Sequence, residues 1–362
     1  MSVHALTSVS GKRVLVTGGA GFIGSRLCKV LTAQGAEVTA YDNLLAQVHG
    51  PAPILDPGLN LVRGDMRDRA GLSGVIADVR PQIVVHLAAE TGTGQSADEP
   101  SRYCEVNVSG TATMIELLKD MQEPPARVVL AATRAVYGEG AYRDETGAIL
   151  APEPRSSINM ARGEFNALGL DGKQLTPVPT SEALPPRPGS VYGSTKLMQE
   201  YLLQQTPSPW DYVILRLQNV YGPGQSLRNP YTGVLSIFCE QAMSGRQLRI
   251  FEDGDIHRDF VYVDDVVDAF ARACVSASAS RRTINIGSGE KTSIKEAALL
   301  ILHELGLPPT VEVTGQFRPG DIRHALADTT LARTVLHWAP AVPFAQGVQT
   351  LVGWAREQAA GH

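Results

Sequence analysis

One short stretch near the amino end, residues 14–24 (VLVTGGAGFIG), constrains the fold more than any other part of the chain. Its apolar start predicts a buried strand, its glycines predict a turn, and a helix is predicted to follow. Gly18, Gly21 and Gly24 have the spacing GxxGxxG. The first glycine permits a sharp turn, the second lets a pyrophosphate approach the backbone, and the third lets the helix pack closely on the strand. Because a helix N-terminus also attracts phosphate, the stretch predicts a dinucleotide-binding turn.

An acidic residue after the next strand specifies the dinucleotide. The run Glu37–Tyr41 predicts a second strand, and Asp42 follows it, about 20 residues beyond the turn. A carboxylate at this place accepts hydrogen bonds from the adenosine ribose hydroxyls and repels a 2′-phosphate. We therefore expect NAD rather than NADP.

Apolar strand-like runs alternate with helical patterns through the first two thirds of the chain. Continuous apolar strands separated by helices predict a parallel sheet that is covered on both faces. The fold class is therefore a doubly wound α/β sheet of the Rossmann type, in which ligands bind at the carboxyl ends of the strands. Further strands are predicted at 60–64, 83–87, 127–131 and 212–216, and helices at 22–34, 72–79, 103–121 and 191–205.

This alternation breaks twice. Residues 138–190 are rich in Pro and Gly, and we expect them to form an ordered flap near the active site rather than a mobile loop. After Tyr221 the pattern changes to that of a smaller, mixed α/β substrate-binding lobe. The predicted NAD-binding domain is 11–220, with an insertion at 138–190 and a return at 258–286, and the predicted lobe comprises 221–257 and 287–362.

Charge and cysteine content restrict the partners. The net charge of −5 argues against a nucleic acid or an anionic membrane surface as the main partner. Residues 1–11 lack the apolar segment of a signal peptide, and no stretch approaches the length of a membrane span. The four cysteines have no CxxC spacing, so we expect free thiols, no metal site and a cytoplasmic protein.

A tyrosine and a lysine supply the candidate chemistry. Tyr192 and Lys196, in the run YGSTK, lie one helical turn apart on the same helix face. The ammonium group and the positive nicotinamide ring of NAD⁺ would lower the phenol pKa from about 10, which makes Tyr192 a candidate general base toward a sugar hydroxyl. Thr133 follows a predicted strand and could hydrogen-bond the reacting oxygen. An ordinary helix face and a strand-capping threonine are the alternatives.

These motifs resemble those of the extended short-chain dehydrogenase/reductase family, in its nucleotide-sugar epimerase and dehydratase branch. The resemblance covers nearly the whole chain. It rests on TGGAGFIG (17–24), Asp42 and Asn43, GDM (64–66), HLAA (86–89), Asn107, VYG (136–138), YGSTK (192–196), LRLQNVYGPGQ (215–225), RDFVYVDD (258–265), NIGSG (285–289) and RPGDIR (318–323).

The resemblance implies NAD as the cofactor, a nucleotide-diphosphate sugar as the substrate, and a homodimer that pairs the helices near 103–121 and 191–205 in a four-helix bundle. It implies a catalytic triad of Thr133, Tyr192 and Lys196. Arg258 and Arg318 are implied to hold the diphosphate, with a surface ion pair as the alternative for each. The implied cofactor residues are Gly18, Gly21, Phe22, Ile23, Gly24, Asp42, Asn43, Asp65, Met66, Leu87, Ala88, Ala89, Asn107, Tyr192 and Lys196, and the implied substrate contacts are Glu90, Gln95, Ser96, Thr133, Asn219, Arg258 and Arg318.

Two features that this chain lacks restrict the type of reaction that it can catalyse. Dehydratases and decarboxylases of this branch carry acidic residues directly after the Thr or Ser, where this chain has Arg134 and Ala135. A 4-reductase usually prefers NADPH, which Asp42 disfavours. We therefore expect a 4-epimerase that oxidises the C4 position of the sugar transiently and reduces it again from the other face.

Three segments of the sequence bear on the identity of the substrate. Residues 88–96, the insertion after Gly140 and residues 317–324 are similar to those of dTDP-L-rhamnose 4-epimerases, which make dTDP-6-deoxy-L-talose. A UDP-hexose 4-epimerase, a nucleotide-sugar 4-reductase or dehydrogenase, and a non-catalytic NAD-binding protein are the alternatives.

Overall fold

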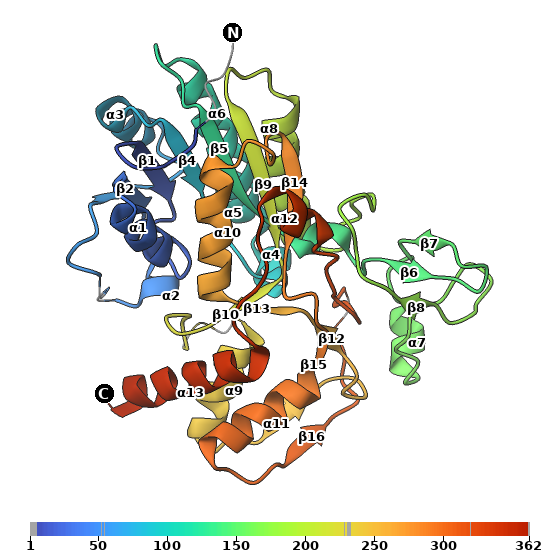
Figure 1. Ribbon diagram of the computed structural model, residues 1–362. Helices are drawn as coiled ribbons and strands as arrows, with labels where there is room; N and C mark the ends of the chain where they lie inside the picture. The colour runs from blue at the N-terminus through green and yellow to red at the C-terminus, as the bar shows by residue number, and fades with distance from the viewer. Residues whose placement is uncertain are drawn as a thin grey trace.

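The larger part of the molecule is built on a seven-stranded parallel sheet with the strand order β14-β9-β5-β4-β1-β2-β3 (Figure 1). The computed structural model describes residues 6–51, 53, 55–227, 229, 233–318 and 320–360. Residues 1–5 of the N-terminus and Pro319 of the RPGDIR motif lie outside these ranges. The strands are β1 (Arg13–Thr17), β2 (Glu37–Asp42), β3 (Leu61–Arg63), β4 (Ile83–His86), β5 (Arg127–Thr133), β9 (Asp211–Leu217) and β14 (Arg282–Ile286).

Helices cover both faces of this sheet, because its strands are apolar on both sides. In β1, Val14 and Val16 belong to one apolar core, and Leu15 belongs to the core on the opposite face. The predicted doubly wound parallel sheet is confirmed. One face carries α1 (Gly24–Ala33), α10 (Val263–Val275) and α12 (Thr330–Val335), and the other carries α3 (Arg69–Val79), α6 (Gly110–Lys119) and α8 (Val191–Gln205).

The single helix predicted over 103–121 is three consecutive helical segments in the structure. They are α5 (Pro100–Tyr103), the π-helical η1 (Cys104–Ser109) and α6. Asn107 lies in η1 and is fully buried. Its Oδ1 accepts a hydrogen bond from the backbone N–H of Glu90 at 2.8 Å, and its Nδ2 donates to the carbonyl of Glu90 at 3.0 Å. A local π turn is a common device at functional sites, and here it carries the side chain that holds the loop after β4.

The smaller lobe lies below the sheet in Figure 1. Three helices pack around its own apolar core, and α11 begins with a capping box in which Ser293 and Glu296 bond each other's backbone N–H. Its elements are α9 (Val234–Met243), α11 (Ile294–Leu305) and α13 (Phe344–Ala360), with the strand pairs β10 (Asn219–Tyr221) and β13 (Phe260–Tyr262), β11 (Leu248–Ile250) and β16 (Val311–Val313), and β12 (His257–Arg258) and β15 (Thr292–Ser293).

One part of the predicted lobe packs on the sheet instead. Helix α12 contacts β14, and Trp338 belongs to the same core as Val14 and Val16. The indole N–H of Trp338 donates to the carbonyl of Asp265 at 2.9 Å. The chain therefore crosses back to the sheet within the predicted range 287–362 before it ends in α13.

The insertion has secondary structure of its own and projects from the body (Figure 1). A buried ion pair joins it to the lobe, in which Arg155 of the insertion contacts Glu252 at 2.9 Å. This pair is extended within the insertion by Glu139, 3.0 Å from Arg155, and within the lobe by Arg323, 2.8 Å from Glu252. Its elements are β6 (Tyr142–Arg143), β7 (Ile149–Leu150), β8 (Thr176–Pro177) and α7 (Ser157–Ala161).

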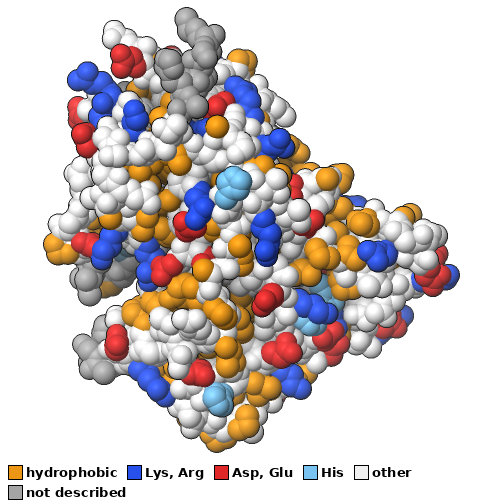
Figure 2. All heavy atoms as spheres, viewed as in Figure 1, with side chains coloured by type: hydrophobic (Ala, Val, Ile, Leu, Met, Phe, Trp, Pro, Cys, Tyr) orange, Lys and Arg blue, Asp and Glu red, His pale blue; other side chains and the backbone are white. Residues whose placement is uncertain are grey.

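The outer surface mixes both signs of charge. Figure 2 shows acidic and basic side chains interspersed over this face of the sheet domain, the lobe and the insertion. Among the described residues, none of the helices combines the length and the apolar character that a bilayer crossing needs.

Candidate active site

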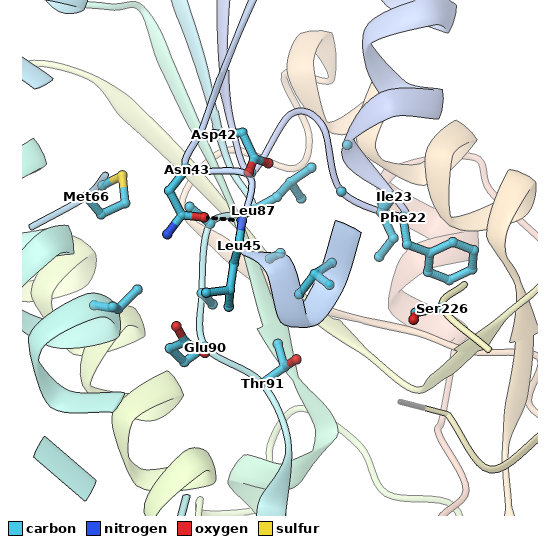
Figure 3. A pocket seen from close by; sticks show the side chains of 18 of the residues that line it. Phe22, Ile23, Asp42, Asn43, Leu45, Met66, Leu87, Glu90, Thr91 and Ser226 are labelled. Carbon is cyan, nitrogen blue, oxygen red and sulfur yellow. Dashed lines mark hydrogen bonds between the residues drawn. The ribbon is translucent and has the colours of Figure 1, made fainter. Parts of the chain in front are cut away.

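A cavity of about 400 Å³ opens at the carboxyl ends of the sheet strands, beside the point where the strand order reverses between β1 and β4. Figure 3 shows Phe22 and Ile23 on one side of it and Asp42, Asn43 and Met66 on another. Every residue predicted to bind the cofactor lines this cavity except Asn107, which lies behind the wall. The predicted residues that line it are Gly18, Gly21, Phe22, Ile23, Gly24, Asp42, Asn43, Asp65, Met66, Leu87, Ala88, Ala89, Tyr192 and Lys196.

The glycine turn has the close packing that its spacing predicts. Gly18 has φ +70°, and a Cβ atom there would lie 2.7 Å from the backbone N of Ala88. A Cβ atom on Gly24 would collide with the carbonyl oxygen of Gly18. Helix α1 starts without a side-chain cap, and although the N–H of Ser25 donates to the carbonyl of Gly21 at 3.0 Å, the N–H of Gly24 has no such cap and is available to a ligand in the cavity. This geometry fits the pyrophosphate of a dinucleotide.

Asp42 is buried at the end of β2. Its Oδ2 accepts from the backbone N–H of Ala20 at 3.1 Å and its Oδ1 accepts from that of Leu44 at 2.9 Å. Burial alone would raise the carboxyl pKa, but these bonds and His49 hold the pKa below its ordinary value. Asp42 is therefore ionised at neutral pH and keeps further lone pairs for ribose hydroxyls.

Asp65 is placed at the same end of the cavity as Asn43 and Met66. Arg67 and the Asn43 amide bond its carboxylate, the latter at 3.0 Å, and these contacts lower the pKa of Asp65. Asn43 also accepts from the backbone N–H of Leu45 at 3.0 Å, which is the bond drawn in Figure 3. These bonds fix the polar wall of the cavity opposite the glycine turn.

The three predicted catalytic residues are brought together from β5 and α8. Thr133 is the last residue of β5, and it lines the cavity with Tyr192 and Lys196 from the start of α8. Ser190 caps α8 by accepting from the N–H of Gly193 at 3.1 Å. Ser96 accepts from the backbone N–H of Tyr192 at 3.1 Å, which fixes the first turn of the helix.

The electrostatics of this triad depend on burial. Burial raises the pKa of Tyr192, while the Thr133 hydroxyl and the charge of Arg134 oppose the rise. Burial lowers the pKa of Lys196 to about 7, against an opposing effect of Glu200. In the protein alone, the cation that acts on the phenol is thus Arg134. The predicted joint effect of Lys196 and the nicotinamide ring concerns the cofactor-bound protein and stays a prediction.

A second cavity of about 270 Å³ adjoins Thr133 and Tyr192. Arg134, Gln218, Asn219 and Arg258 also line it, and Gly138 and Gly189 from the ends of the insertion reach it. Among the described residues, no hydrogen-bond donor reaches Oε1 of Gln218 or Oδ1 of Asn219, although both atoms are buried. Such unpaired acceptors fit a ligand that carries hydroxyl or N–H groups.

The remaining predicted substrate residues are scattered. Glu90 lines the main cavity and is paired with Arg102 at 2.8 Å. Gln95 and Ser96 are buried in α4 (Thr93–Asp98) and line neither cavity. Arg318 is exposed and lies over the ring of Phe251, 4.8 Å from its centroid, outside both cavities.

The structure adds cavity residues for which no sequence pattern indicates a function. Gln47 and His49 come from α2 (Ala46–His49), which is too short to show a periodic pattern. Gln225 and Ser226 follow β10 in the linker to the lobe. In the sequence, Arg134 is notable only because dehydratases and decarboxylases of this branch carry an acidic residue at its position, yet it lines the second cavity.

Known proteins are similar to this chain in both fold and sequence. The family described as the NAD dependent epimerase/dehydratase family matches residues 14–159 and 171–287. The dTDP-L-rhamnose 4-epimerase of Burkholderia thailandensis is 39% identical over 358 residues, which are 97% of this chain and 96% of that protein.

Solved structures agree with this relationship. The UDP-glucose 4-epimerase of Thermotoga maritima, solved with UDP-glucose, has a TM-score of 0.80 and 29% identity over 96% of this chain and 99% of that one. The UDP-glucose 4-epimerase of Thermus thermophilus, solved in complex with NAD, has a TM-score of 0.77 and 30% identity over 95% and 99% of the two chains. The chain therefore belongs to the NAD-dependent epimerase/dehydratase family and uses NAD as its cofactor.

Proposed function

We propose that this enzyme is a nucleotide-sugar 4-epimerase that interconverts dTDP-L-rhamnose and dTDP-6-deoxy-L-talose. The observation that carries the proposal is the meeting of Thr133, Tyr192 and Lys196 in one cavity with the glycine turn and Asp42. The absence of an acid at Arg134 and Ala135 argues against elimination. The 39% identity to the Burkholderia enzyme supports the dTDP-sugar, and the likeness to UDP-glucose 4-epimerases makes UDP-hexoses the second candidate.

Each triad residue has a role in the proposed reaction. Bound NAD⁺ supplies the chemistry that a protein side chain lacks, a reversible acceptor for the hydride of the sugar C4 carbon. The Tyr192 Oη takes the proton of the C4 hydroxyl during oxidation and returns a proton during reduction. The Thr133 hydroxyl hydrogen-bonds the reacting oxygen, and Lys196 stabilises the phenolate and holds the nicotinamide ribose. Electrons and protons therefore balance over the cycle, and only the configuration at C4 changes.

The proposed cofactor contacts follow the same cavity wall. The turn from Gly18 to Gly24 binds the pyrophosphate, and Asp42 binds the adenosine ribose. Asp65 and Met66 hold the adenine, and the run from Leu87 to Ala89 lines the nicotinamide side. Asn107 acts behind the wall by holding Glu90 in place.

We further propose a cytoplasmic homodimer. Helix α8 has Met198, 44% exposed, and Tyr201, 36% exposed, on its outer face. These two apolar side chains lie on one side of the helix at i and i+3, as a helix–helix contact requires. Pairing of α8 and the α5-η1-α6 run with those of a second copy would bury them.

The proposed reaction is tested by incubating the purified protein with dTDP-L-rhamnose or UDP-glucose and following the sugar by NMR. A 4-epimerase gives an equilibrium mixture of the two C4 epimers without added NADH or NADPH. Stoichiometric reduction or oxidation of the nicotinamide would instead identify a dehydrogenase or a 4-reductase. Conversion of UDP-glucose but not dTDP-L-rhamnose would move the assignment to the UDP-hexose epimerases.

Replacing Asp42 with Ala is expected to weaken NAD binding by about tenfold, the effect of losing one charge-assisted hydrogen bond, and to relax discrimination against NADP. The carboxylate is ionised and ends the strand beside the glycine turn. Its loss therefore removes the hydrogen bonds to the ribose hydroxyls of NAD and also the repulsion of the 2′-phosphate of NADP. Affinities for NAD⁺ and NADP⁺ measured on cofactor-stripped protein check this. Glu37→Ala, at the exposed start of the same strand, is the matched control. An unchanged cofactor preference would mean that another group reads the ribose.

A further inference from the structure

Arg134 stands beside the catalytic residues without an assigned role. It is the first residue of η2 (Arg134–Tyr137) and follows Thr133 directly. It lines the second cavity together with Thr133 and Tyr192. The charge of Arg134 opposes the rise in the pKa of Tyr192 that burial causes. The chain therefore places this cation in the same cavity as the two hydroxyl groups of Thr133 and Tyr192.

Around the second cavity, the carboxylates of Asp321 and Glu139 act on the charge of Arg134, but neither forms an ion pair with it within the described part of the chain. Arg258, the other arginine that lines it, is paired with Asp321 at 3.1 Å and donates to the carbonyl of His257 at 2.8 Å. Within the part of the chain that the structure describes, Arg134 makes a single hydrogen bond, from Nη2 to the carbonyl of Gly138 at 3.2 Å, and no ion pair. A guanidinium has five N–H donors, so most of its donors are available to a ligand.

Arg134 keeps its charge at neutral pH. Burial and the neighbouring Arg258 lower its pKa to about 10, against the opposing charges of Asp321 and Glu139, and the group stays protonated. A half-buried cation without an anionic partner is unfavourable, and binding proteins keep such groups where a ligand supplies the missing acceptors.

We propose that Arg134 is a further substrate-binding residue, whose guanidinium donates hydrogen bonds to hexose oxygens and holds a positive charge beside the oxygen that Tyr192 deprotonates. The substrate contact rests on the proposed epimerase function. The charge acts on Tyr192 whatever the sugar is. A fixed cation favours the phenolate over the phenol, so a larger fraction of Tyr192 is in the form that accepts the C4 proton, and the same cation stabilises the negative charge that develops on the sugar oxygen.

Other groups around Tyr192 do not replace this charge. The ring of Tyr103, from α5, stands edge-on at 6.4 Å between centroids and is neutral at neutral pH. Thr133 contributes a hydroxyl, and Ser96 bonds only the backbone N–H. Lys196 lies on the same helix, but burial lowers its pKa to about 7, so it is only partly charged in the protein alone.

The first test needs no substrate. The absorbance of tyrosinate is recorded against pH for cofactor-stripped wild-type protein and for Arg134→Met, and the Tyr192→Phe form of each is subtracted to isolate Tyr192. Loss of the cation is expected to raise the midpoint of Tyr192 ionisation by about one pH unit. Arg134→Lys keeps a charge and is expected to stay near the wild-type midpoint. Arg143→Met removes an exposed arginine of the insertion that lines neither cavity and is the matched control.

The second test measures kcat and KM for the nucleotide sugar. Arg134→Met is expected to lose at least about tenfold in kcat/KM, with a raised KM, because hydrogen bonds to the sugar are lost. Arg134→Lys should recover part of kcat but not KM, since an ammonium lacks the planar fork. A wild-type midpoint together with a wild-type KM in Arg134→Met would overturn the inference. Absence of epimerisation by the wild-type protein would overturn the proposed function, while the ionisation comparison would still decide the role of the Arg134 charge.

Discussion

Replacing Tyr192 with Phe is expected to lower the turnover of the nucleotide sugar by about 10²- to 10⁴-fold, the contribution of a positioned general base. The substitution removes the phenolic oxygen and keeps the ring, so the edge-on contact with Tyr103 and the packing of α8 persist. Thr133 and Lys196 remain in the cavity, but neither side chain can replace the Tyr192 phenol as the general base. NAD binding should change little, because the glycine turn and Asp42 are untouched.

Single-turnover kinetics and NAD content of the purified variant separate these effects. Tyr201→Phe, on the exposed face of the same helix, removes a phenolic oxygen that lies outside both cavities and is the matched control. Retention of turnover in Tyr192→Phe would reject Tyr192 as the base. Loss of turnover with loss of bound NAD would instead assign the residue a binding role.

The sheet and the cofactor cavity could be predicted because their signals are local. The apolar runs of β1, β2 and β4 and the glycines of the turn carry their structural meaning within a few residues, and α8 has the predicted bounds Val191–Gln205. Asp42 ends its strand at the sheet edge where all the parallel strands end, so its place in the cavity follows from the topology.

Contacts between distant segments could not be predicted in this way. Ser96 reaches the backbone of Tyr192 rather than a cavity, and Arg318 lies on Phe251. Both placements depend on how a loop or the lobe packs on the sheet, which no local pattern encodes. The ion pair between Arg155 and Glu252 likewise depends on where the insertion meets the lobe.

Replacing Glu200 with Gln is expected to reduce the free energy of unfolding by about 3–5 kcal/mol, the usual penalty for breaking a buried ion pair on one side. Arg216 on β9 and Glu200 on α8 are 6% and 0% exposed, and Nη2 of the arginine lies 2.6 Å from Oε2 of the glutamate. The guanidinium also lies over the ring of Tyr137, 4.6 Å from its centroid. The variant leaves this cation in the interior without an anion.

The control is Glu116→Gln on α6, whose ion pair with Arg69 is exposed and should contribute less than about 1 kcal/mol. Urea unfolding of both variants, with Arg216→Met and the double variant Glu200→Gln/Arg216→Met, gives the coupling between the two charges. The double variant should be less destabilised than the sum of the two single ones, because removing both charges leaves none unpaired. If Glu200→Gln lowers the free energy of unfolding by less than about 1 kcal/mol, then water reaches Arg216.

The same substitution reaches the active site through Lys196, one helical turn before Glu200. The carboxylate opposes the lowering of the Lys196 pKa by burial, so its neutralisation should lower that pKa further below about 7. Lys196 then loses its proton at a lower pH, and turnover should begin to fall at a lower pH on the alkaline side of the profile. Glu116→Gln leaves the profile unchanged. The buried pair thus joins α8 to the sheet, and its carboxylate at the same time increases the charged fraction of the active-site lysine, which links the stability of the fold to the pH range of the reaction.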